Sequence, residues 1–190
     1  MWLTLAFTSA ALLGFYDAAK KQSLTGNAVL PVLLLNTLFS ALFLLPMIVS
    51  AECGFGWFDG TILAASSGTL RAHGLVLLKA VIVLTSWIFG YFAMKHLPIT
   101  IVGPINATRP VMVLVGAMLI FGERLNACQW TGVVLTLLSL FLLSRSSRRE
   151  GVDFRHNVWI LCIAVAALAA VVSGLYDKYI MERLDPVFVQ

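Results

Sequence analysis

The chain has 190 residues, of which 60% are hydrophobic and only 12% are charged. A soluble domain carries about 25% charged and about 45–50% apolar residues, so this composition excludes a disordered chain, a nucleic-acid-binding domain and a disulfide scaffold. Thirteen Lys and Arg against nine Asp and Glu give a formal charge of +4. The composition predicts an integral, multi-pass membrane protein, which we expect in a bacterial-type cytoplasmic (inner) membrane.

Six apolar stretches are long enough to be transmembrane helices, which need about 20 mostly apolar residues. The expected fold class is therefore an all-α membrane protein, a polytopic helical bundle. Lys79, near the start of the third span, is expected to extend its amine to the interface. The segment 52–73 before it is expected to be an interfacial loop. The expected spans are approximately residues 2–19, 28–51, 74–94, 97–122, 126–144 and 157–180.

An internal repeat relates the first span to the sixth. A shift of 160 residues places Gly14-Phe15-Tyr16-Asp17 on Gly174-Leu175-Tyr176-Asp177. Five spans separate equivalent points, so the second copy crosses the membrane in the opposite direction, as in many secondary transporters. We expect residues 1–150 to form one five-helix repeat, and 151–190 to hold a basic loop and the first helix of an inverted second repeat.

The chain stops at Gln190, where a seventh span would begin. We therefore expect a truncated chain. The alternative is a natural half-sized protein that pairs with a second chain, as a homodimer or a heterodimer.

Asp17 ends the first copy of the repeated motif, one to two turns inside the end of its span. Lys20 and Lys21 follow at i+3 and i+4, a spacing that suits an ion pair on a helix. We expect such a pair at the level of the interface. The alternative is a proton or substrate site that the repeat duplicates. Gly14 and Gly174 are expected to let their helices pack closely against neighbours.

The second and third spans carry polar and aromatic side chains at helical spacing. Asn36 and Ser40 share one face of the second span, and Trp87 and Tyr91 share one face of the third. Such groups either contact a substrate or form interhelical hydrogen bonds and packing contacts, and the sequence leaves both interpretations open.

Arg109 is the most informative residue of the fourth span. It lies about 12 residues after Leu97, roughly 18 Å along a helix, which is near mid-membrane, where an arginine costs at least about 2.5–3.5 kcal/mol. Pro110 cannot donate a backbone hydrogen bond to Asn106, so the first half of this helix is expected to be bent or broken. Asn106 and Arg109 are expected to line a cavity where Arg109 binds an anionic or carboxylate group. Alternatively, Arg109 pairs with a buried acid or with freed carbonyls.

The connection to the fifth span is a tight turn. Gly122 is a plausible C-cap for the fourth helix, and Asn126 with Gln129 has the spacing of a capping box for the fifth. Glu123 lies where the chain reverses and is expected to cap a helix or pair with a nearby base.

Residues Tyr91 to Ser144 resemble the EamA family of the drug/metabolite transporter superfamily. The family typically has ten helices in two five-helix halves and moves small metabolites or drugs across the membrane, so the resemblance implies this activity. The motifs that carry it are the turn Ala93–Pro98, Thr-Arg-Pro at Thr108–Pro110, Phe-Gly-Glu-Arg-Leu at Phe121–Leu125 and Gln-Trp-x-Gly at Gln129–Gly132.

The sequence thus predicts a transmembrane transporter that works by alternating access. The alternative is a non-transporting membrane subunit, or an inactive remnant, that needs a partner chain. No hydrolase, phosphate-binding or metal motif is found, so we predict no enzyme, catalytic residue, metal or cofactor. The expected partners are the lipid bilayer and an unidentified small molecule, with no nucleic acid. The residues expected to face the substrate path are Arg109, Asn106, Asp17, Asn36, Trp87 and Tyr91.

Overall fold

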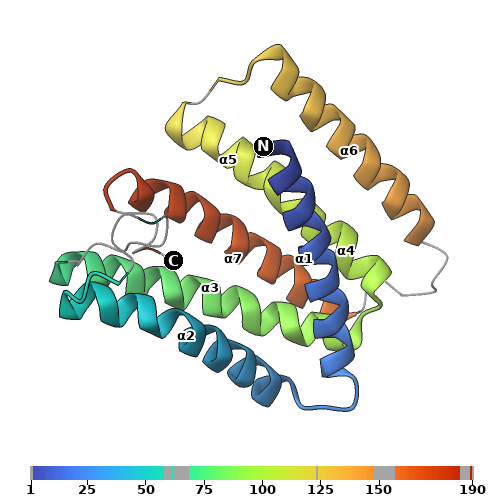
Figure 1. Ribbon diagram of the computed structural model, residues 1–190. Coiled ribbons are helices and arrows are strands. Elements are labelled where there is room, and N and C mark those ends of the chain that lie inside the picture. The colour runs from blue at the N-terminus through green and yellow to red at the C-terminus, as the bar shows by residue number, and fades with distance from the viewer. Residues whose placement is uncertain are drawn as a thin grey trace.

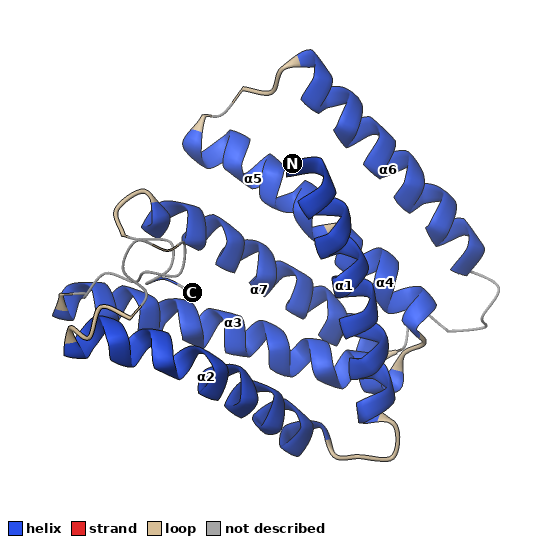
Figure 2. Ribbon diagram, in the orientation of Figure 1, coloured by secondary structure: helices blue, strands red, loops and turns tan. Residues whose placement is uncertain are grey.

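The computed structural model describes residues 2–57, 61, 69–122, 124–147, 157–184 and 189. Within these ranges the chain is helical and contains no strand (Figure 2), which confirms the predicted all-α fold class. The helices are α1 (Trp2–Leu24), α2 (Val29–Cys53), α3 (Leu70–His96), α4 (Ile99–Ala107), α5 (Arg109–Phe121), α6 (Ala127–Ser147) and α7 (Val158–Met181).

Four segments of the described chain are long and apolar enough to cross a membrane. They are Val29–Ser50, Leu70–His96, Ile99–Phe121 and Val158–Met181. The other two expected spans correspond to α1 and α6, and α1 contains three charged residues close to its C-terminal end. The described helices have the lengths and compositions of a polytopic membrane protein.

Helix α7 lies in the middle of the assembly. It runs antiparallel to α3 along nearly its whole length, and α5 packs against it as well (Figure 1). Helix α2 covers α3 from the outside, while α1 crosses near the C-terminal end of α3, and α6 lies farthest out, where it contacts α4. The start of α7 is anchored by stacking of Trp159 on His96, with ring centroids 3.6 Å apart. Through α3 and α5, α7 therefore connects the two sides of the bundle.

Glycines permit the close approach of α5 to α7. A Cβ atom on Gly116 would lie 2.7 Å from Leu175 Cδ1, and one on Gly174 would lie 3.1 Å from Val113 Cγ2. The close packing predicted at Gly174 is therefore confirmed. The same prediction is wrong at Gly14, because a Cβ atom there would meet nothing within 4 Å.

The fourth predicted span is two helices, α4 and α5, separated at Thr108. The Thr108 hydroxyl donates to Ile105 O at 2.7 Å, and its backbone N–H donates to Ile105 O at 3.2 Å, so the α-helical hydrogen-bond pattern is interrupted. Pro110 follows in the first turn of α5, where its missing N–H costs nothing. The predicted break is thus confirmed, and it places Arg109 at the first position of a new helix.

Helix boundaries follow local capping signals. Helix α3 begins at Leu70 instead of the expected Gly74, because the Thr69 side chain accepts a hydrogen bond from Ala72 N. Asn126 and Gln129 bond to each other's backbone N–H at 2.8 and 2.9 Å, which confirms the predicted capping box.

At the end of α5, Gly122 has φ 66° and ψ 22°, the left-handed conformation typical of a helix C-cap. The role predicted for Glu123 lies outside the described residues, as do 58–60 and 62–68 of the predicted interfacial loop. The loop prediction is wrong at both ends of the segment, because α2 extends to Cys53 and α3 begins at Leu70.

A buried apolar core surrounds the C-terminal end of α3. Its members come from α1, α2, α3, α4 and α7, and Lys21 connects α1 to the same place. The Lys21 amine donates to Met94 O at 2.6 Å and to Leu97 O at 2.8 Å, which satisfies carbonyl groups left free at the end of α3. In the other direction, Lys95 Nζ donates to Asn27 O at 2.9 Å. The core residues are Leu24, Val29, Leu33, Tyr91, Ala93, Met94, Leu97, Val102, Ile163 and Ala166.

We expect Lys21→Met to destabilise the protein by about 1.5–3 kcal/mol, the worth of a hydrogen bond to a charged group. The apolar part of the side chain is kept, while the carbonyl oxygens of Met94 and Leu97 lose their donor. Thermal unfolding of the purified protein in detergent measures the effect. The neighbouring exposed residue provides the control, and an equal loss of stability for Gln22→Met would contradict the assignment.

Candidate functional site

The break between α4 and α5 presents two buried polar atoms that have no hydrogen-bond partner among the described residues. They are Nε of Arg109, the first residue of α5, and Oδ1 of Asn106, in the last turn of α4. Nε is a donor and Oδ1 is an acceptor. Buried polar groups are nearly always satisfied, so a pair of this kind is typical of a place where another molecule supplies the partners.

Helix α1 brings an acid and a base to the same place. Asp17 and Lys20 both lie within electrostatic range of Arg109, although α1 and α5 are far apart in sequence. The predicted ion pair of Asp17 with Lys21 is wrong, because the Lys21 amine turns to the end of α3 instead. Nor does Asp17 form an ion pair within 4.0 Å with Lys20 in the described part of the chain. The acid therefore contributes its charge to the surroundings of Arg109.

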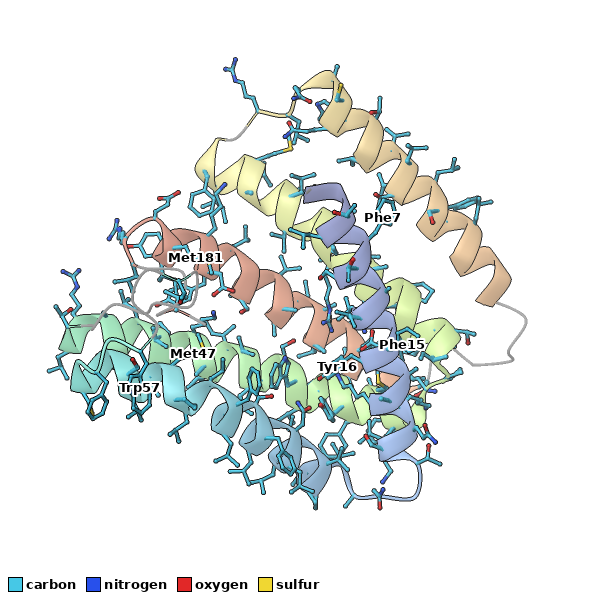
Figure 3. All side chains as sticks on the ribbon, viewed as in Figure 1. Phe7, Phe15, Tyr16, Met47, Trp57 and Met181 are labelled. Atoms are coloured by element: carbon cyan, nitrogen blue, oxygen red, sulfur yellow. The ribbon has the colours of Figure 1, made fainter. Side chains whose placement is uncertain are left out.

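Two tyrosines form the aromatic wall of this region. Tyr91 of α3 is 1% exposed, and its hydroxyl lies 3.3 Å from the hydroxyl of Tyr16. The Lys20 amine lies 4.0 Å from the centre of the Tyr91 ring, a cation–π contact. Figure 3 shows Tyr16 on the side of α1 that faces α3, with Phe15 on the opposite side, where it is 76% exposed. The Tyr-Asp end of α1 thus points into the bundle.

We name these residues the Arg109 cluster: Asp17, Lys20, Tyr91, Asn106 and Arg109. Two of its members are cationic and one is anionic, so the cluster has a surplus of one positive charge. It also offers a free N–H donor and a free amide oxygen. Chemically, this arrangement suits a ligand with an anionic group next to a hydrogen-bond donor.

Asn36 and Trp87, the two other residues predicted for the path, are not members of the Arg109 cluster. Trp87 lines a cavity of about 380 Å³ between α2 and α3, together with Thr37 and Lys79. Neither Asp17 nor Arg109 belongs to its lining. Asn36 is half-buried on α2, one residue before Thr37. Trp87 also packs against the buried core that contains Tyr91, so it lies next to the Arg109 cluster.

A second charged site, between α3 and α7, was missed from the sequence. Lys79 Nζ lies 3.0 Å from Asp177 Oδ1, and it also donates to Val189 O at 3.0 Å. The expectation that Lys79 reaches the interface is wrong, because the residue is buried at 9% exposure. The signal that could have found the pair is its complementary charge, since Lys79 is an isolated charge in an apolar span and Asp177 is an acid near the end of another.

Among the described residues, no group of three His, Cys, Asp or Glu side chains is arranged to hold a metal ion. The three cysteines are free thiols on three different helices.

Comparison with known proteins identifies one family. The model of the EamA-like transporter family matches residues 1–145, a range that covers every residue of the Arg109 cluster. No curated protein and no solved structure matches the chain. The match confirms the resemblance noted in the sequence and, together with the apolar helices, establishes an integral multi-pass membrane protein. The chain belongs to the EamA-like transporter family, within the drug/metabolite transporter superfamily.

Proposed function

We propose that the protein is a secondary transporter, in a bacterial-type cytoplasmic membrane, that moves a small molecule bearing an anionic group such as a carboxylate. Family membership supports transport as the class of activity. The observation that carries the substrate class is the buried Nε of Arg109, which has no hydrogen-bond partner among the described residues.

An arginine at this depth needs compensation. Near mid-membrane its charge costs at least about 2.5–3.5 kcal/mol, and Asp17 opposes it without forming a direct pair. A carboxylate ligand would neutralise the remaining positive charge and accept hydrogen bonds from the planar guanidinium. Asn106 would accept a hydrogen bond from a donor on the same ligand, because its free buried atom is an acceptor.

The helix break provides the place for such a ligand. Discontinuous helices near the bilayer midplane are typical of substrate sites in secondary transporters, since the positive ends of half-helix dipoles point at anionic groups. Helix α5 begins at Arg109, directly after the interruption at Thr108, so the guanidinium belongs to the residue at the helix break itself. Alternating access would then expose the Arg109 cluster first to one side of the membrane and then to the other.

A thermal-shift screen of the purified full chain tests the substrate class. The screen compares small carboxylic acids with their neutral amides of the same size. We expect stabilisation by one or more of the acids and none by the matched amides, because only the acids supply the missing negative charge. Each acid that binds is then tested for transport into proteoliposomes. Stabilisation by amides or amines alone would contradict an anionic substrate.

A further inference from the structure

The two copies of the Tyr-Asp motif contact opposite ends of α3. On α1, the Tyr16 hydroxyl lies 3.3 Å from that of Tyr91, near the C-terminal end of α3. On α7, the equivalent Tyr176 hydroxyl donates to Leu75 O at 3.2 Å, near the N-terminal end of α3. The same sequence motif therefore meets one helix at two levels.

Each of the two levels contains an aspartate. Asp177 follows Tyr176 and contacts Lys79, while Asp17 belongs to the Arg109 cluster beside Tyr91. Twelve residues separate Lys79 from Tyr91, which is roughly 18 Å along a helix. Half of the hydrocarbon core is about 15 Å thick, so the two layers lie at clearly different depths along α3.

The two layers differ in their pairing. At the α7 layer, the Lys79 and Asp177 side chains are 11% and 27% exposed and form a direct ion pair of 3.0 Å. Lys79 is held further by Val189 O. At the α1 layer, Asp17 has no direct ion pair in the described part of the chain, and Arg109 Nε is unsatisfied. Asp177 Oδ1 also has no hydrogen-bond partner among the described residues, so each layer has an unsatisfied buried polar atom, and the two layers differ in the direct ion pair that only the α7 layer forms.

The contact between α3 and α7 does not depend on this salt bridge. Ser86 Oγ donates to Ala166 O at 2.8 Å, and a Cβ atom on Gly90 would lie 3.7 Å from Ala166 Cβ, so the two helices pack closely further along. Burying charges in hydrocarbon is expensive even when they are paired. The Lys79–Asp177 pair costs free energy to bury, and other contacts already hold α3 against α7. The pair is therefore not needed to hold the two helices together, which points to a role in transport.

We propose that the Lys79–Asp177 ion pair is a gate at one end of the substrate path. The pair forms while its half of the membrane is closed, and it separates when that half opens and water hydrates both charges. The gate rests on the proposed function, because it requires an alternating-access cycle.

Cysteine labelling of the full chain tests the gate without a substrate. The native Cys53, Cys128 and Cys162 are replaced by alanine, and Ser173→Cys is introduced as the reporter. Ser173 is 7% exposed and lies one helical turn before Asp177. A membrane-impermeant maleimide is applied to right-side-out vesicles and, separately, to inside-out vesicles.

With the ion pair intact, we expect slow labelling of the reporter from both sides. Asp177→Asn, and independently Lys79→Met, should accelerate labelling at least tenfold from one side only. Exchanging the charges, with Lys79→Asp and Asp177→Lys together, should restore slow labelling. The control reporter is Ala167→Cys, which replaces a small residue of α7 that is 4% exposed and should stay slow in every variant.

The gate is overturned if the single variants label no faster, if labelling rises equally from both sides, or if the charge exchange fails to restore protection. Faster labelling at Ala167→Cys would also overturn it, because that result indicates local unfolding of α7. Failure of the proposed substrate class gives a different result. If no carboxylic acid stabilises the protein but the single variants are still labelled faster from one side only, the substrate class is wrong and the gate is supported.

Discussion

Replacement of Arg109 by glutamine is expected to abolish binding and transport of the anionic ligand while the protein still inserts into the membrane. The substitution keeps much of the side chain and some hydrogen-bonding capacity but removes the positive charge beside the free amide oxygen of Asn106. Loss of one partner of a desolvated charge pair costs about 2 kcal/mol or more, a weakening of affinity of at least roughly thirtyfold. Ligand titration by thermal shift measures the affinity, and proteoliposome uptake measures transport.

Arg71→Gln is the matched control, because Arg71 is exposed in the first turns of α3. It removes the same charge from the chain and should leave affinity and uptake unchanged. Wild-type affinity in the Arg109 variant would remove this residue from the substrate site. Equal losses in both variants would indicate an effect of overall charge instead of a specific contact.

Gly174→Leu is expected to separate α5 from α7 and destabilise the bundle by about 1–3 kcal/mol, as is typical of overpacking. A Cβ atom at this position would lie only 3.1 Å from Val113 Cγ2, and on the facing helix Gly116 is already closed in by Leu175. Neither α5 nor α7 can move aside for the leucine side chain without losing the close contact between the two helices. Heating the detergent-solubilised protein and measuring the fraction that stays monodisperse gives the effect.

The repeat supplies the control for this experiment. Gly14 is the counterpart of Gly174, on α1, and a Cβ atom there would meet nothing within 4 Å. Gly14→Leu makes the same chemical change in the same sequence motif and improves intrinsic helix preference by the same amount, below about 1 kcal/mol, so its thermal stability should equal or slightly exceed that of the wild type. Similar losses at both positions would show that helix packing is not the cause.

Much of the fold could be predicted from local sequence signals. The apolar runs indicated the helices, Pro110 indicated the break at Thr108, and the spacing of Asn126 and Gln129 indicated the capping box. Each of these features depends on residues that are neighbours in the chain. A proline interrupts the helix that contains it, and a cap satisfies N–H groups only a few positions away.

The charged contacts between helices could not be predicted in the same way. Lys79 and Asp177 are 98 residues apart, and whether they meet depends on how α3 and α7 rotate and slide against each other. Hydropathy gives the depth of a residue in the membrane but not the direction of its side chain. Lys21 was misassigned for the same reason, because its carbonyl partners at the end of α3 compete with Asp17, a nearer acid in the sequence.

The contacts between Lys21 and Met94, and between Lys95 and Asn27, fasten the C-terminal end of α1 to the end of α3. Helix α1 then behaves as a lever with a fixed pivot. Fourteen residues separate Lys21 from Phe7, a lever arm of roughly 21 Å, so a tilt of about 15° displaces the helix at Phe7 by roughly 5 Å. A rocking of α1 about this end would therefore move its N-terminal part far more than the charged end beside Arg109, which the two contacts hold against α3.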